Sequence, residues 1–289
     1  MKLGDWNFRA FHDGRFKLDG GSMFGVVPKV MWEKKHPADE NNRIDLDLRC
    51  LLVDNGDRRI LVDTGMGDRW AERQTKMFGL VRRPNQLLAE LAEAGITRES
   101  ITDVVLTHLH FDHAGGALRE GADGLEPVFP QARHWVQERH WNWASNPSER
   151  DRASFRADDF SALKDKGKLE LVDGPTEIMP GVRVTPISGH TPGQQVVEFH
   201  TGKGVVAFVG DLLPFLSQVH IPWIMGFDLN PLLTVTEKKQ FLTRAVEDSF
   251  TLVFEHDHLN EAATVKFEDG KFKPDLVFTL DDPPVMGKE

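Results

Sequence analysis

The sequence predicts an α/β protein of two related halves, in which short apolar strands alternate with helices. First, apolar runs of strand length recur in both halves, bounded by Gly, Asn or Asp. Second, each half contains one segment with the apolar spacing and end signals of a helix. Third, three apolar strands stop at a histidine or an aspartate, namely His108, Asp211 and His256. No Pro-, Gly- or Ser-rich linker divides the 289 residues, so we expect one domain.

In the first half, residues 44–53 begin with alternating apolar and polar side chains and end in an apolar run, which predicts a strand. The following DNGDR predicts a hairpin turn, and RILVDTG, residues 59–65, a second strand. Residues 84–96 predict a helix that has a proline near its start and ends at Gly95. DVVLT, residues 103–107, predicts a short buried strand that runs into a cluster of histidines.

The second half repeats this pattern. TEKKQFLTRAVED, residues 236–248, predicts a helix with Thr236 at its N-cap. The last strand, TLVFEHDH, ends in two further histidines, His256 and His258. The strands of this half are expected at residues 181–187, 194–200, 204–210 and 251–258.

The composition excludes several classes of protein. The formal net charge is −10, so no nucleic-acid partner is expected, because phosphate binding needs clustered Lys and Arg. No apolar run approaches the roughly 18 residues of a membrane span, and MKLGDWNFRA lacks the apolar region of a signal peptide. The single cysteine, Cys50, cannot form an internal disulfide. We therefore expect a cytoplasmic protein with neither nucleic acid nor membrane as a partner. The chain also has no tyrosine, so no phenol can donate a proton.

The motif THLHFDHAGG, residues 107–116, concentrates metal-binding side chains. Because alternate residues of a strand end share a face, His108 and His110 can hold one ion. Asp112 and His113, on the turn that follows, can point at a second ion beside it. Four such residues within six positions are hard to explain as structural or merely solvated groups, so the motif predicts a metal site.

Further ligands are expected from the strand ends of the second half. The candidates are His190 in SGHTPG, Asp211 and His256, with His258 as the alternative to His256. Asp63 in LVDTG is expected to orient a histidine rather than to bind metal. Imidazole and carboxylate donors together suit Zn²⁺, with Mn²⁺ or Fe as alternatives, and a carboxylate between two cations can bridge them. The remaining histidines, at 12, 36, 134, 140, 200 and 220, are interpreted as surface groups or as partners of the ligands.

These motifs resemble the metallo-β-lactamase superfamily in residue type and in order along residues 62–256. The resemblance implies a four-layer αββα sandwich, two mixed sheets flanked by helices, with the site at one edge. The chain is similar to the lactonase and methyl-parathion-hydrolase branch, whose members bind two metal ions, usually zinc. By this resemblance, His108, His110 and His190 bind one metal; Asp112, His113 and His256 bind the other; and Asp211 bridges them.

Two departures from the superfamily bear on activity. Many of its β-lactamases use a cysteine ligand, but the matching position here is Asp211, and Cys50 lies far upstream. This argues against β-lactam hydrolysis. Many of its acyl-homoserine lactonases place a catalytic tyrosine after the bridging aspartate, whereas this chain continues as DLLPF. This departure either argues against lactonase activity or leaves the polarisation of a substrate to the metals alone.

The resemblance and the donor set lead to a hydrolase hypothesis. A hydroxide bridging two metals is expected to attack a neutral ester or lactone, and Asp112 to carry a proton to the leaving group. A phosphotriesterase that uses the same metals is the first alternative. A diiron redox protein is an alternative of another class, although no appended module for a flavin is apparent. Each hydrolase hypothesis requires a small-molecule substrate.

Two apolar stretches without a clear period, residues 20–32 and 212–227, are candidates for the wall of a pocket over the metals. Alternatively they pack in the core or form a homodimer interface. Residues 1–43 are accordingly interpreted as part of a single domain, 1–289, in which they form an extension that covers the pocket or mediates dimerisation. Residues 133–143 offer either aromatic lining or an amphipathic helix. The candidate pocket residues are Phe24, Met31, Trp32, Phe215, His220 and Trp223.

Overall fold

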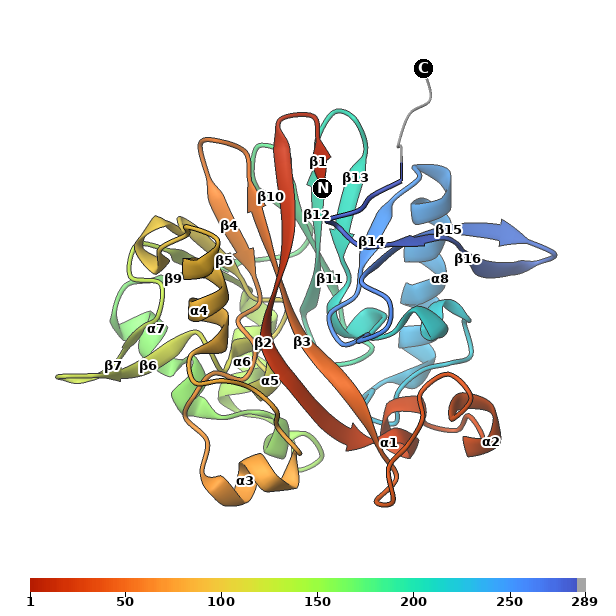
Figure 1. Cartoon of the computed structure of the whole chain (residues 1–289), viewed down its shortest axis with the longest axis horizontal. Helices are drawn as coiled ribbons and strands as arrows, with labels where there is room; N and C mark the ends of the chain where they lie inside the picture. Colours follow the sequence, from red (N-terminus) through yellow and green to blue (C-terminus); the bar gives the residue numbers. More distant parts are fainter. Residues whose placement is uncertain (285–289) are drawn as a thin grey trace.

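Two mixed sheets of seven strands each form the centre of the protein in a computed structural model, which describes residues 1–284 (Figure 1). In spatial order, the first sheet contains β1 (Lys2–Leu3), β2 (Trp6–Asp19), β3 (Arg43–Asp54), β4 (Arg59–Val62), β5 (Asp103–Val105), β8 (Arg133–Gln137) and β9 (Leu169–Val172). The second contains β10 (Thr176–Met179), β11 (Val182–Ile187), β12 (Gln194–His200), β13 (Val205–Phe208), β14 (Thr251–Val253), β15 (Ala262–Glu268) and β16 (Lys271–Phe278). A separate hairpin consists of β6 (Leu118–Gly121) and β7 (Gly124–Pro127).

Helices cover the outer face of each sheet (Figure 1). Leu91 of α4 (Gln86–Glu93) packs in one apolar cluster with Val104 of the first sheet, and Leu242 of α8 (Pro231–Glu247) packs in another with Leu252 of the second. A third cluster fills the space between the sheets, because alternate strand residues face inward. The predicted αββα sandwich is therefore confirmed. The other α-helices are α1 (Gly20–Phe24), α2 (Lys29–Trp32), α3 (Glu72–Met77), α5 (Phe111–Ala114), α6 (Glu138–Ser145) and α7 (Ser161–Asp165).

Parallel strand pairs in the middle of each sheet prepare the site. In the first sheet β4 pairs in parallel with β5, and in the second β13 pairs in parallel with β14. Parallel strands end at the same edge of a sheet, so the loops that follow these four strands come together. The predicted strands thus lie close to their expected places, although β4 and β14 end before the polar residues of their motifs.

The long helix of the second half begins earlier than predicted. It starts at Pro231, and its N-cap is Asn230, whose side chain accepts a hydrogen bond of 3.2 Å from the backbone N–H of Leu233. Proline at the first helical position is favourable because its missing N–H would have no partner there. Thr236 lies inside the helix and donates instead to the carbonyl of Leu232, so its assignment as N-cap was wrong.

The N-terminal residues are integrated into the first sheet. β2 forms a long antiparallel ladder with β3, so residues before Gly20 belong to the sandwich rather than to an extension. Residues 20–32, expected to lack regular structure, contain the short helices α1 and α2 instead. Residues 133–143 form β8 and the start of α6, with Trp141 packed in the core. That residues 1–289 form a single domain stays a prediction.

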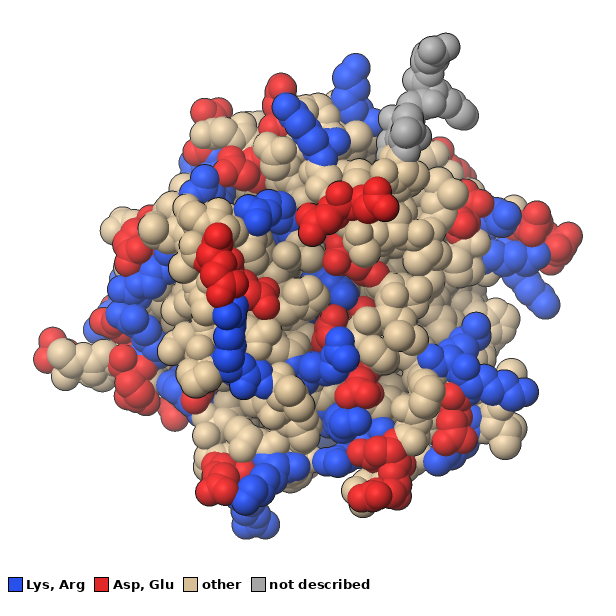
Figure 2. Space-filling view, viewed as in Figure 1, with Lys and Arg blue, Asp and Glu red and all other residues tan. Residues whose placement is uncertain are grey.

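The surface carries mixed charge. On the face shown in Figure 2, Lys and Arg side chains alternate with Asp and Glu, and the described residues form no continuous basic patch there. Within residues 1–284, no helix has the length and apolar character that a membrane crossing requires.

Candidate metal centre and substrate cavity

The seven predicted ligands meet at the sandwich edge where the central strands end. The β5 end and α5 carry His108, His110, Asp112 and His113, and the loops of the second sheet carry the other three. All seven side chains are buried or nearly so. The structure therefore brings together every residue predicted as a ligand. It does not include His258, the alternative to His256, in any group of potential ligands.

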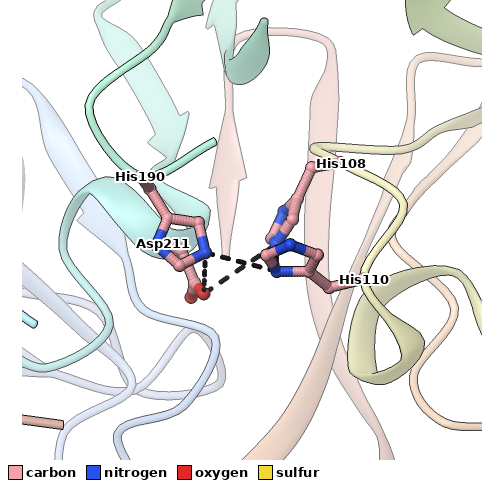
Figure 3. A group of neighbouring side chains, drawn as sticks. All are labelled: His108, His110, His190 and Asp211. Carbon is pink, nitrogen blue, oxygen red and sulfur yellow. Dashed lines mark hydrogen bonds and ion pairs between the residues drawn. The ribbon is translucent and has the colours of Figure 1, made fainter. Parts of the chain in front are cut away.

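Four of these side chains form the first group: His108, His110, His190 and Asp211 (Figure 3). One donor atom of each lies within 4.8 Å of the others. His110 Nδ1 is 2.9 Å from His108 Nε2 and 3.3 Å from His190 Nε2. His190 Nε2 is in turn 3.2 Å from Oδ2 of Asp211. Three imidazole nitrogens and one carboxylate oxygen converging in this way are a donor set that suits tetrahedral Zn²⁺.

The second group contains Asp112, His113 and His256. His256 Nε2 lies 3.3 Å from His113 Nε2 and 3.7 Å from Oδ2 of Asp112. His113 Nε2 lies 3.9 Å from the same carboxylate oxygen. Two imidazoles and a carboxylate leave a further position for a shared ligand.

Asp211 lies between the two groups. Its Oδ2 is 3.7 Å from His113 Nε2 as well as close to His190, and its Oδ1 is 3.2 Å from His256 Nε2. Oδ1 is buried and has no hydrogen-bond partner. A buried carboxylate oxygen without a partner is costly unless a cation satisfies it. Both the position and the missing partner of this oxygen fit a pair of metal ions.

Four of the histidines are held at the ring nitrogen that faces away from the centre. Such contacts fix the orientation and tautomer of a metal-binding imidazole. The contacts are His108 Nδ1 with Thr107 Oγ1 at 3.1 Å, His113 Nδ1 with Asp63 Oδ2 at 3.1 Å, His190 Nδ1 with Asp228 Oδ1 at 3.0 Å, and His256 Nδ1 with the Asp47 carbonyl at 2.8 Å.

Asp63 has the orienting position that the sequence predicted. Its backbone adopts the left-handed conformation, φ 55°, which is unfavourable for a residue with a side chain. Two hydrogen bonds of 2.6 Å hold it there, because its carboxylate accepts from both the backbone N–H and the hydroxyl of Thr107. The neighbouring loop packs so closely that a Cβ on Gly116 would lie 2.2 Å from the Thr64 carbonyl oxygen. A Cβ on Gly115 would lie equally close, 2.2 Å, to the Met66 carbonyl oxygen, so both glycines that end the histidine motif are required by this packing.

Two buried carboxylates beside the ligands were not predicted from the sequence. Asp228 lies in the loop before α8, and no metal-binding pattern marks it. Glu255 is fully buried, and its Oε2 is 2.8 Å from His113 Nδ1, although neither oxygen makes a hydrogen bond. Its position directly before His256 in FEHDH was the available signal.

His140 ties the histidine motif to the second half of the chain. It is buried, and its Nε2 accepts a hydrogen bond of 2.8 Å from the backbone N–H of Leu109. Its Nδ1 therefore carries the proton and donates to the carbonyl of Pro192 at 2.9 Å. Burial lowers the pKa of His140 to about 4, so the ring stays neutral and keeps both contacts.

The ligand groups differ in their affinity for protons. Burial lowers the pKa of His108 well below its ordinary value. Burial also disfavours the charged form of His256, but the carboxylates of Asp211 and Glu255 outweigh it and raise the pKa to about 9. Burial would raise the pKa of Asp211, yet His113 and His190 hold it well below the usual range. Protons and cations thus compete for the same donor atoms.

A cavity of about 710 Å³ opens onto the two groups. Asp112, His190 and Asp211 are among the potential ligands that line it, and apolar side chains form most of the remaining wall. Most of these come from the sheet, from α1 and the residues after it, from the loop before α8, and from α5 and the end of α3. The apolar lining residues are Leu18, Met23, Val26, Leu46, Phe78, Phe111, Ala153, Met225 and Phe227.

The predicted pocket residues do not line this cavity. Phe24, Trp32, Phe215 and Trp223 are buried in an aromatic cluster, where Phe24 stacks on Trp32 and on Phe215. Met31 and His220 are exposed outside the cavity. The assignment of these six residues was therefore wrong, because α1, α2 and the loop before α8 turn their largest aromatic side chains inward. Their smaller neighbours, such as Met23 and Met225, contact the cavity instead.

Comparison with known proteins agrees with this geometry. The chain is 27% identical to an N-acyl homoserine lactonase of Bacillus cereus over 173 residues, which are 56% of this chain and 62% of the relative. It is 31% identical to a probable metallo-hydrolase of Mycobacterium tuberculosis over 218 residues, 66% of each chain. The chain thus spans under two thirds of the length of these curated relatives.

The fold has a closer match among solved structures. A probable metal-dependent hydrolase from Staphylococcus aureus superposes with a TM-score of 0.88 at 28% identity, covering 96% of this chain and 98% of the other. The family model described as "Metallo-beta-lactamase superfamily" matches residues 49–256, which include all seven predicted ligands. This match covers more than half of the chain, and the chain therefore belongs to the metallo-β-lactamase superfamily.

Proposed function

We propose that this metal-dependent hydrolase holds two divalent metal ions, zinc by preference, and cleaves a neutral ester or lactone. The observation that carries the proposal is the pair of buried donor groups that share Asp211 at the end of an apolar cavity. The proposed ligands are His108, His110 and His190 for the first metal, Asp112, His113 and His256 for the second, and Asp211 for both.

When bound, two adjacent divalent ions lower the pKa of water toward 7 and polarise the oxygen on which negative charge develops. The side chains around them supply position and proton transfer. Asp112 lines the cavity at its metal-binding end, and this position supports a role for its carboxylate in carrying a proton to the leaving group. No tyrosine is present in the chain to assist it.

The serines that line the cavity are not activated as nucleophiles. Its lining includes two serines, Ser22 and Ser154, and neither hydrogen-bonds to a histidine among the described residues. A serine without a base is a weak nucleophile, so a covalent intermediate is not expected. The reaction then consists of one attack by activated water and one protonation of the leaving group.

The wall of the cavity favours an uncharged substrate with an apolar part. The apolar residues of α1 and of the loop before α8 can bury such a group while the scissile bond reaches Asp112 and Asp211. The relative named as an N-acyl homoserine lactonase supports a lactone or a related ester. The phosphotriester alternative differs only in the reacting centre, and the same assay decides between them.

The test is a hydrolysis panel of esters, lactones and phosphotriesters on protein whose metal content has been quantified. About two metals per chain and turnover of an ester or lactone are expected. His256→Ala should lose the second metal and the activity, whereas His258→Ala should keep both. A wild-type protein with a single metal contradicts the two-metal site. Turnover of phosphotriesters alone would contradict the substrate class, and an intense visible absorption band with no hydrolysis would favour the diiron alternative.

A further inference from the structure

We propose that Lys238 is a positioning residue that holds in place the segment 220–227, whose last three residues line the substrate cavity. Lys238 lies on α8, and 1% of its surface is exposed. Its ammonium group donates three hydrogen bonds to backbone carbonyls of this segment. The Nζ distances are 3.3 Å to His220 O, 3.2 Å to Ile221 O and 2.7 Å to Trp223 O.

The environment of Lys238 is unusual for a buried lysine. A buried ammonium group is normally paired with a carboxylate, because leaving water is costly for a charge. Among residues 1–284, no carboxylate lies within ion-pair distance of Lys238. Within the described part of the chain, the only hydrogen-bond partners of its ammonium group are the three carbonyls. Burial lowers its pKa to about 7, although Asp228 acts in the opposite direction. The next residue, Lys239, is exposed on the same helix and has none of these contacts.

The three carbonyls lie directly before the residues that line the cavity. Met225, Gly226 and Phe227 follow Trp223 and form part of the lining. The backbone of Gly226 connects this segment to the rest of the wall, since its N–H donates to the Ser22 carbonyl at 2.8 Å and its carbonyl accepts from Arg150 at 2.7 Å. A shift at residues 220–223 would therefore change the shape of the cavity.

The metal centre has a separate attachment. Beyond Phe227 the chain is bonded to the His190 region, with Leu229 N donating to His190 O at 3.0 Å and Asn230 N to Gly189 O at 2.8 Å. These contacts hold the Asp228 carboxylate beside His190 without Lys238. Loss of the ammonium group is thus expected to disturb substrate binding and to leave the metal ligands in place.

The inference rests on the proposed hydrolase function, because a substrate is needed to read the shape of the cavity. We compare Lys238→Met, which removes the three donors but keeps an unbranched side chain, with Lys239→Met as the matched control. Lys238→Met should raise KM about tenfold for esters or lactones with a long apolar group, with kcat within about twofold and metal content unchanged. KM for a small acetate ester should hardly change.

Hydrogen exchange provides a reading that does not depend on activity. Amides of residues 220–227 should exchange faster in Lys238→Met than in wild type, while those around His108 and His190 keep their protection. Unchanged exchange in residues 220–227 and an unchanged KM would overturn the proposal. Loss of metal together with activity would also overturn it, by placing Lys238 in support of the metal centre. If wild type hydrolyses nothing, the proposed function fails, and the exchange experiment still decides the role of Lys238.

A second variant covers the case in which Lys238→Met does not fold. Lys238→Gln retains two N–H donors without a charge, and should give an intermediate rise in KM and in exchange over residues 220–227. If KM and the exchange rates of residues 220–227 in Lys238→Gln equalled those of wild type, the three hydrogen bonds of the ammonium group would not be what positions this segment.

Discussion

The metal centre and the cavity wall are built in different ways, although they enclose the same space. The candidate ligands extend from the ends of central strands, and most of their imidazoles are fixed from behind by a carboxylate, a hydroxyl or a carbonyl. Much of the wall over them comes from α1 and residues 225–227, which lie outside both sheets and are joined by a backbone hydrogen bond from Gly226 N to Ser22 O. The position of the reacting groups is thus fixed by the fold, whereas the shape of the substrate site depends on a few replaceable side chains.

The largest effect is expected from a change at the shared carboxylate. Asp211→Asn keeps the size of the side chain but removes the charge that faces both donor groups. We expect kcat/KM to fall about a thousandfold, about 4 kcal/mol, with the fold intact by circular dichroism. Turnover near the wild-type level would show that Asp211 is not shared by two metals.

A dependence of metal binding on pH should follow from the raised pKa values in the metal-free centre. His256, with a pKa of about 9, holds a proton at pH 7 that a metal must displace, and the pKa of His190 is shifted in the same direction. Metal affinity should therefore rise with pH, by about tenfold per pH unit for each proton released, until pH 9. Competition with a metal-buffering chelator at pH 6, 7 and 8 measures this rise. An affinity that does not vary over this range would contradict protonation of the empty centre.

A weaker effect is expected where a ligand is supported from behind. Asp228→Asn still accepts a hydrogen bond from His190 but lacks the negative charge, so metal affinity should fall about tenfold or somewhat more. Asp57→Asn, in the exposed β3–β4 turn, is the matched control. Equal metal affinities in the two variants would show that the charge of Asp228 does not support the metal centre.

The smallest effect is expected at the wall. Phe227 lines the cavity and is 40% exposed, so Phe227→Ala removes apolar contact with a substrate and nothing from the ligands. KM for long apolar substrates should rise about fivefold to tenfold, with metal content unchanged. Leu232→Ala, on an exposed leucine outside the cavity, should leave KM as it is. A fall in metal content in Phe227→Ala would contradict the expectation that the cavity wall does not support the metal centre.

The metal ligands could be predicted from the sequence more completely than the cavity wall. His108, His110, Asp112 and His113 are nearly contiguous, and the superfamily resemblance indicates the rest of the set, so the sequence is enough to predict all seven candidate ligands. Asp228 could not be predicted, because its partner, His190, is distant in the sequence and no spacing rule connects them. Their roles as ligands or supports stay predictions until metal is measured.

The wall could be predicted by segment but not by residue. Both apolar stretches do reach the cavity, but their direction depends on how α1 and the loop before α8 pack. From the sequence, large aromatic side chains in these stretches were expected to line the cavity. In the structure Phe24 and Trp223 instead pack against each other and are buried in the core. The start of α8 was mispredicted for a similar reason. Thr236 is a residue type that favours the N-cap position, but the helix begins earlier, at Asn230 and Pro231, two residues that on composition alone indicate a loop. Hydrophobic pattern locates an element more reliably than it orients one.

The division of the candidate ligands between the two sheets has a consequence for the stability of the protein. Four of them follow β5 of the first sheet, and the other three are carried by loops of the second. Bound ions would act as non-covalent cross-links between the two halves of the sandwich, as a disulfide does in a secreted protein. Each tenfold rise in free metal above its Kd would then add about 1.4 kcal/mol per ion to the free energy of unfolding. In a metal-starved cell, the chain would lose resistance to proteolysis along with its chemistry, so metal supply would set its abundance.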